Sequence, residues 1–80
     1  MGFSRVPKQR REKYREKYPI GSIIAILAGN TSYFGRIDSF SLKNVQIMEM
    51  ALMATRSRRH MSETHKKRDI DYEKIIGPAE

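Results

Sequence analysis

The stretch that decides the fold is residues 20–50, which read IGSIIAILAGNTSYFGRIDSFSLKNVQIMEM. This stretch is apolar, and its four ionised side chains cancel, whereas the rest of the chain is densely charged. Runs rich in β-branched and aromatic residues, separated by turn-forming residues, favour strands joined by tight turns. The pattern predicts three strands, at residues 20–28, 31–40 and 45–54.

The second of these strands carries two sets of side chains on opposite faces, because side chains alternate along a strand. The sets are Tyr33, Gly35 and Ile37 on one face, and Phe34, Arg36, Asp38 and Phe40 on the other. A glycine inside a strand marks a sharp bend or a close backbone approach. The stretch therefore predicts the wall of a small, strongly bent β-barrel.

Methionines dominate the third predicted strand. Ile47 and Met48 are adjacent apolar residues, which predicts a bulge or a shift as the strand bends. Flexible thioether side chains fill irregular gaps in cores. We therefore expect Met48, Met50 and Met53 to fill the core rather than to hold a cofactor.

Working outward, residues 8–18, KQRREKYREKY, predict a helix, because Pro7 suits its first turn and Pro19 stops it. Tyr14 and Tyr18 fall on one face of this helix. Packing on the end of the barrel is the favoured role of these tyrosines, and base stacking is the alternative. Residues 1–7 are expected to be a flexible basic tail.

The C-terminal third divides into two parts. Residues 55–69, TRSRRHMSETHKKRD, have almost no apolar side chains and predict a long basic insertion, partly helical or disordered. Residues 70–76, IDYEKII, predict a fourth strand with Ile70, Tyr72 and Ile76 on one face. Residues 78–80 are expected to be a tail, which leaves little or no room for a fifth strand.

Positive charge gathers in two blocks on either side of the neutral stretch. Residues 1–18 hold seven Lys or Arg against two Glu, and residues 56–68 hold six against one Glu, within a chain of net charge +7. Two such blocks in an 80-residue chain indicate a polyanionic partner, most often nucleic acid. A solvated surface that aids solubility is the simpler alternative.

Several function classes are excluded or disfavoured. The chain has no cysteine, so disulfides and thiolate metal sites are excluded. Ser62, His65 and Asp69 are triad residue types without a scaffold, and His60, Glu63 and His65 do not match a common metal spacing. We expect no catalysis, no cofactor and no metal.

No membrane association is expected either. The longest apolar run, residues 23–28, is too short to span a bilayer, and the helix presents only two tyrosines to a membrane surface. No secretory signal is visible in the sequence. A cytoplasmic location is therefore expected, or a nuclear one if the source is eukaryotic.

The order of these elements resembles the Sm and Sm-like (LSm) family of small RNA-binding barrels, whose bacterial relative is Hfq. The resemblance covers residues 8–77. Its first motif corresponds to Gly21, Ile24, Ile26, Gly29, the run Tyr33-Phe34-Gly35-Arg36-Ile37, and the loop Ser41-Leu42-Lys43-Asn44. Its second motif is matched by Ile75-Ile76-Gly77, where Ile76 stands in place of the family's Arg.

This resemblance implies a mainly β, Sm-like barrel with a short N-terminal helix and a fifth strand that is short or missing. It implies that Asn44 hydrogen-bonds a base edge and that Lys43 contacts phosphate or base. It also implies subunit contacts through open strand edges, and hence a homo- or hetero-oligomer.

The sequence thus predicts a non-catalytic protein of a ribonucleoprotein complex, which binds single-stranded or ribosomal RNA. Phosphate contacts supply affinity without sequence information. The expected phosphate contacts are Arg5, Lys8, Arg10, Arg11, Lys13, Arg15, Lys17, Arg56, Arg58, Arg59, Lys66, Lys67 and Arg68. A ribosomal or other structural RNP protein is a close alternative. A protein-interaction module that pairs its strand edges with an acidic partner is a different one.

Overall fold

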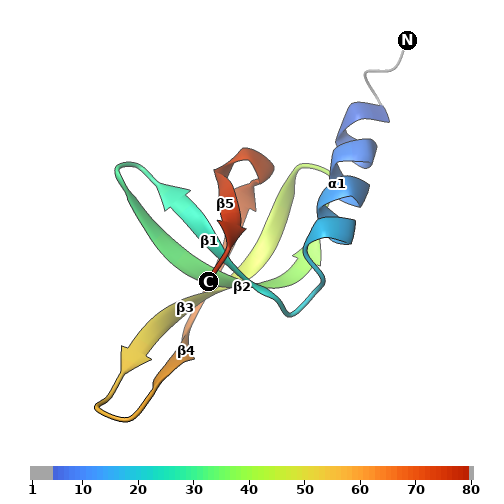
Figure 1. Cartoon of the computed structure of the whole chain (residues 1–80). Coiled ribbons are helices and arrows are strands. Elements are labelled where there is room, and N and C mark those ends of the chain that lie inside the picture. The colour runs from blue at the N-terminus through green and yellow to red at the C-terminus, as the bar shows by residue number, and fades with distance from the viewer. Residues whose placement is uncertain (1–4, 80) are drawn as a thin grey trace.

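The computed structural model describes residues 5–79 of the chain. One helix precedes five strands, and a single turn of 3₁₀-helix joins the last two strands (Figure 1). The elements are α1 (Arg5–Lys17), β1 (Ile23–Ala28), β2 (Thr31–Phe40), β3 (Asn44–Ala54), β4 (Arg59–Asp71), η1 (Tyr72–Lys74) and β5 (Ile75–Pro78).

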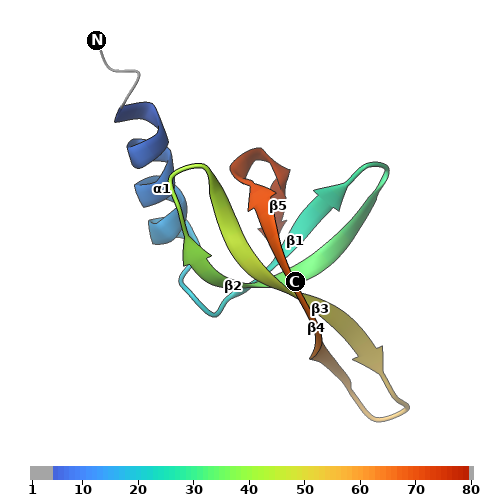
Figure 2. The same ribbon diagram turned by 180° about the vertical axis from the view of Figure 1, so that it is seen from behind.

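The five strands form one open antiparallel sheet in the order β4-β3-β2-β1-β5. β4 and β5 are its edge strands. The sheet bends sharply, so that the β1–β2 and β3–β4 hairpins point in different directions (Figures 1 and 2). The predicted mainly β domain with an N-terminal helix is confirmed, and the fifth strand is present but short.

The helix begins earlier than predicted. Arg5, Val6 and Pro7 were assigned to the tail but form the first turn of α1, where a proline costs no backbone hydrogen bond. Residues 1–4 of the predicted tail lie outside the described residues. The amide of Tyr18 still donates to the carbonyl of Tyr14 at 2.8 Å, and Pro19 then ends the helical pattern.

The core lies on one face of the sheet, here called the inner face. Ile24, Ile26, Ile37, Val45 and Ile47 are fully buried there. Gly35 sits between Ile26 and Ile47, and a β-carbon built on it would lie 2.7 Å from the Cδ1 atom of each. The predicted glycine in the bent strand is therefore required by close packing of side chains against the backbone.

A bulge in β2 corrects one predicted face. The pairing of β2 with β3 shifts between Ile37 and Ser39, so that Asp38 is the extra residue. This shift moves Phe40 from the predicted outward face to the core, where it is buried. A single inserted residue reverses the facing of every side chain after it.

The predicted burial of the β3 methionines is confirmed for two of the three. Met48 and Met50 are buried, at 7% and 8% exposure, but they lie outside the core cluster, and Met53 is 47% exposed. The β3 pairing with β2 runs without a shift from Ile47 to Met50, whereas its pairing with β4 shifts between Met48 and Met50. Both members of the Ile47-Met48 doublet are buried because both faces of the sheet are covered at this point.

The predicted insertion at residues 55–69 is wrong. Residues 59–71 form β4, the longest strand of the sheet, and only residues 55–58 form a turn between β3 and β4. In that turn the amide of Thr55 donates to the carbonyl of Arg58 at 2.8 Å. Pairing with β3 satisfies the backbone along one edge of β4, so the strand forms without an apolar face of its own.

The predicted strand at residues 70–76 is divided between three elements. Ile70 ends β4 in the core, Tyr72 lies in η1 and is 1% exposed, and Ile76 lies in β5 with 58% of its surface exposed. The expected common face therefore breaks at η1. β5 pairs with β1, and the amide of Ala79 donates to the carbonyl of Ile23 at 3.1 Å. No helix within residues 5–79 has the length and apolar character needed to cross a membrane.

Candidate nucleic-acid interface

The expected phosphate contacts fall into three groups in the structure. The helix group is Arg10, Arg11, Lys13, Arg15 and Lys17 on α1, the hairpin group is Arg56, Arg58 and Arg59 at the β3–β4 turn, and the bulge group is Lys66, Lys67 and Arg68 on β4. α1 and the tip of the β3–β4 hairpin lie at opposite ends of the molecule (Figures 1 and 2). The two basic blocks are therefore not one continuous patch.

Lys8 lies on the exposed side of α1 and belongs with the helix group. The side chain of Arg5 lies outside the part of the chain that the structure describes.

Aromatic rings hold the helix group against the sheet. Tyr14 lies 5.0 Å from Tyr72 and 6.2 Å from Tyr18, measured between ring centroids, and Phe40 stacks on Tyr72 at 6.5 Å. Tyr18 is buried in the core cluster. Packing of the two helix tyrosines is confirmed as their role, because rings used in this way are not free to stack on bases.

Arg10 is committed to the same contact region. Its guanidinium lies 4.9 Å from the centroid of the Tyr72 ring, and its Nη1 is 4.0 Å from a carboxylate oxygen of Glu73. Burial raises the pKa of the Tyr72 phenol above its ordinary value, although Arg10, Arg11 and Arg15 act in the opposite direction. Lys8, Lys13, Arg15 and Lys17 are exposed, so they are the members of the helix group most available to a phosphate.

The turn at residues 41–44 lies beside α1 (Figure 1). Tyr72 links the two, since its hydroxyl donates a hydrogen bond to the carbonyl of Ser41. Lys43 is exposed at this turn. The structure therefore brings Lys43 to the same end of the molecule as the helix group.

Asn44 is half-buried, and its side chain is used in the turn. Its Oδ1 accepts from the Ser41 hydroxyl at 2.8 Å and from Nε2 of Gln46 at 3.1 Å. Its backbone amide and carbonyl also bond to Ser41. Of the Asn44 carboxamide, only the Nδ2 donor is not used within the turn, so the side chain offers an external group a donor and no free acceptor.

The bulge group lies where β4 departs from regular pairing. Met48 pairs with Lys67 and Met50 pairs with Glu63, so three residues of β4 stand opposite Glu49. His65 adopts a φ of 65° there. Thr64 secures the bulge, because its hydroxyl donates to the Glu49 carbonyl at 3.0 Å.

Arg68 is held within the protein. Its Nε lies 3.2 Å from Oε1 of Glu49, and its guanidinium lies 5.5 Å from the centroid of the Tyr33 ring. Among residues 5–79, Arg10 and Arg68 are the only members of the three groups that lie in an ion pair. The remaining cations of these groups are not neutralised by carboxylates of the described chain.

Arg36 is a charged residue whose role the sequence did not indicate. It reaches across the face opposite the core, here called the outer face, to form an ion pair with Glu63 of β4, and it lies 3.7 Å from Asp38. The hydrogen bond to Glu63 raises the pKa of the Arg36 guanidinium above its ordinary value. The network links β2 to β4 over Met48 and Met50. The sequence could not predict the ion pair between Arg36 and Glu63, because the two residues are distant in sequence and meet only through the register of β2, β3 and β4.

The catalytic residue types are not brought together. Ser62 and Asp69 pair with Ala51 and Gln46, at opposite ends of the bulge, and His65 lies within it. At about 3.3 Å per residue these side chains are too widely spaced along one strand to form a triad. No group of three metal-ligating side chains occurs within the described chain.

Comparisons of the chain with protein-family models, with curated proteins and with solved structures give no match.

Proposed function

We propose that this chain is a non-catalytic RNA-binding protein of the Sm-like type, which acts inside the cell as part of a ribonucleoprotein complex. The observation that carries the proposal is the set of cations that internal carboxylates do not neutralise. These side chains extend from Lys13, Arg15 and Lys17 on α1 to Arg56 and Arg58 at the hairpin tip. Such cations attract phosphates and release their counterions.

The topology supports the Sm-like part of the proposal. A helix precedes β1, the strand order is β4-β3-β2-β1-β5, and η1 separates β4 from a short β5. Gly35 of the first motif lies at the core, and Asn44 begins β3 after its turn. These placements agree with the motif positions on which the resemblance rests.

The separation of the basic groups suggests how RNA is bound. One end of the molecule offers the helix group and Lys43, and the other offers the hairpin group. RNA bound at both ends runs along the length of the domain, and contacts of this kind carry little sequence information. The open edge of β5 supplies a surface through which copies or related subunits associate, because arginines at the hairpin end of the opposite edge, β4, would repel a second copy.

A salt titration tests the proposal. If about six phosphates are contacted, the logarithm of the association constant for a labelled single-stranded oligoribonucleotide falls with the logarithm of salt concentration at a slope of roughly −4. A flat dependence would overturn the RNA proposal. Light scattering on the same sample, with the ratio of nucleic-acid to protein absorbance, reports oligomer formation and bound RNA together. Isolation with stoichiometric ribosomal RNA would instead identify a ribosomal protein.

A further inference from the structure

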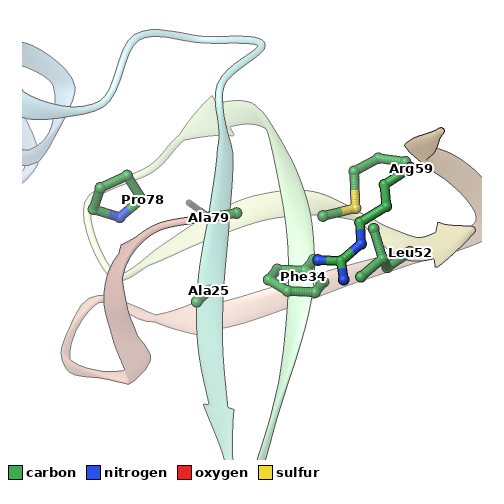
Figure 3. Close-up of a pocket in the computed structure, with 7 residues that line it drawn as sticks. Ala25, Phe34, Leu52, Arg59, Pro78 and Ala79 are labelled. Atoms are coloured by element: carbon green, nitrogen blue, oxygen red, sulfur yellow. The ribbon is translucent and has the colours of Figure 1, made fainter. Parts of the chain in front are cut away.

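The outer face of the sheet carries a pocket at the base of the β3–β4 hairpin, with a volume of about 350 Å³ (Figure 3). It lies between the hairpin on one side and the end of β5 on the other. Its lining is Ala25, Phe34, Leu52, Met61, Pro78 and Ala79, with Arg59 as the one charged member.

The register of the sheet explains why these residues meet. Ala25 pairs with Phe34, and Phe34 pairs with Met50, so the three lie in one row across β1, β2 and β3. Leu52 and Met61 form the next pair along the hairpin. Met50 is buried beneath this surface, yet Leu52 remains 46% exposed. The outer face therefore has an apolar cluster of its own that is only partly covered.

The lining favours an apolar side chain over a nucleobase. Apart from Arg59, no lining side chain carries a hydrogen-bonding group. A base buried here would leave the polar atoms of its edge without partners, which costs binding energy. An aliphatic or aromatic side chain loses no hydrogen bond in such a pocket.

The charge around the pocket selects an acidic occupant. Arg59 reaches from β4 so that its guanidinium points toward Phe34 (Figure 3), and Arg56 and Arg58 lie in the adjoining turn. None of the three lies in an ion pair with another described residue, whereas Glu63 is engaged by Arg36. A second copy of the chain would bring like charges together at this site, which disfavours it as the occupant.

The backbone beside the pocket can hold an extended segment. β4 pairs with β3 alone among the described strands, so the edge that carries Arg59 and Met61 has backbone groups directed away from the sheet. A strand added to an open edge gains main-chain hydrogen bonds, and a pocket beside the edge then selects an alternate side chain.

We infer that the outer-face pocket binds an extended acidic segment of a partner protein, with one apolar side chain in the pocket and a neighbouring carboxylate on Arg59. This site is separate from the proposed RNA contacts on α1, but it shares Arg59 with the hairpin group that is proposed to contact RNA. It gives the chain a protein-binding surface at the base of the β3–β4 hairpin.

Fluorescence polarisation with a labelled peptide, Ser-Glu-Asp-Leu-Glu-Asp-Ser, tests the inference on the full chain. Leu52→Glu is expected to weaken binding about tenfold or more, because it places a negative charge at the pocket mouth that repels the carboxylates of the peptide. Leu52→Ser and a peptide with Ser in place of Leu should each weaken it by a similar factor. Ile20→Glu is the matched control, since Ile20 is exposed outside the pocket, and binding should change by less than about twofold.

Three results would overturn the inference. The first is equal binding of the peptide by Leu52→Ser and by the natural chain, which would mean that the peptide is held by charge attraction alone and not by the pocket. The second is no loss when the peptide leucine is replaced. The third is competitive displacement of the peptide by a single-stranded oligoribonucleotide whose own binding is lost in Leu52→Ser, which would make the pocket a nucleotide site. Circular dichroism of each variant checks that the fold is retained. Failure of the salt titration described above would leave this inference intact, because the comparisons of Leu52→Ser and of the leucine-substituted peptide are made without RNA.

Discussion

Gly35 lies against Ile47 so closely that a β-carbon at Gly35 would be 2.7 Å from its Cδ1 and 3.3 Å from its Cβ. Ile47 is fully buried, as is Ile26 on the other side of the glycine, so neither side chain has space into which to move. The packing of the core around β2 therefore depends on the absence of a β-carbon at position 35.

Gly35→Ala is expected to destabilise the protein by about 1–3 kcal/mol, the usual cost of forcing an extra carbon into a packed core. Urea denaturation followed by circular dichroism measures the change. Gly77→Ala is the matched control, because nothing lies within 4 Å of its β-carbon position. Equal effects of the two substitutions would show that the contact with Ile47 is not the cause.

High pH is expected to destabilise the fold through Tyr72 and Tyr33. Burial raises the pKa of both phenols above the ordinary value of 10.0. The stabilisation from the protonated phenols is therefore complete below pH 10 and is lost as the pH rises through the folded pKa values, because the unfolded chain releases its protons first. As the pH rises above 10, the urea midpoint should fall, and the absorbance of ionised tyrosine should increase over the same pH interval.

The variant Tyr72→Phe distinguishes the contribution of Tyr72 to the high-pH destabilisation from that of Tyr33. The variant loses the hydrogen bond to the Ser41 carbonyl, worth about 1 kcal/mol at neutral pH. Its urea midpoint should then fall less steeply above pH 10 than that of the natural chain. An identical slope would assign the alkaline transition to other groups.

The backbone conformation of His65 predicts an unusual substitution pattern. Its φ of 65° is a left-handed conformation that β-branched residues rarely adopt. His65→Val should therefore cost about 1–2 kcal/mol although the side chain is exposed. His65→Gly should stay within about 0.5 kcal/mol of the natural chain, because glycine accepts this φ. Thermal denaturation of both variants checks the order, and a Val variant as stable as the Gly variant would contradict it.

The two basic ends are expected to act independently on RNA. The pair of substitutions Lys13→Gln and Arg15→Gln should lower the magnitude of the salt slope by about 1.4 if each removes one phosphate contact, and so should Arg56→Gln with Arg58→Gln. The losses in binding free energy should add in the combined variant, because distant sites seldom couple.

Lys74→Gln is the matched control for these variants. Lys74 is exposed in η1 and is not among the residues proposed to contact RNA. A loss of the same size for Lys74→Gln would mean that net charge alone determines binding. A combined variant no weaker than either pair would mean that the two ends do not bind the same RNA.

The sequence predicted those elements whose signals are local. Pro7 lies in the first turn of α1, Pro19 follows its end, and Gly29-Asn30 separates β1 from β2, so short-range chemistry was sufficient there. β4 was missed because its side chains are mostly charged, as suits an exposed edge strand. Its backbone partners are on β3, and such pairing leaves no periodic apolar signal within the strand itself.

The candidate site shows the same division. The positions of the basic blocks in the chain were evident from composition, but their separation to opposite ends depends on the length of β4. The outward position of Met48 and Met50 depends on pairing with Arg36 and Phe34. Phe40 was assigned to the wrong face because the extra residue at Asp38 produces no compositional signal.

The pairing of β5 with β1 has a consequence for the order of folding. β1, β2, β3 and β4 each pair with their neighbour in sequence, whereas Ile24 pairs with Pro78, which brings together the first and last strands of the sheet. Short loops close at a smaller entropic cost than long ones. We therefore expect the hairpins to form first and β5 to dock onto them.

Pulsed hydrogen exchange during refolding measures this order. The amide of Ile37, bonded to the Ser22 carbonyl, should become protected before the amide of Ala79, bonded to the Ile23 carbonyl. Earlier protection of Ala79 would reverse the assignment. Because Pro78 and Ala79 form one wall of the outer-face pocket, the surface inferred to receive a partner is then the last part of the domain to be completed.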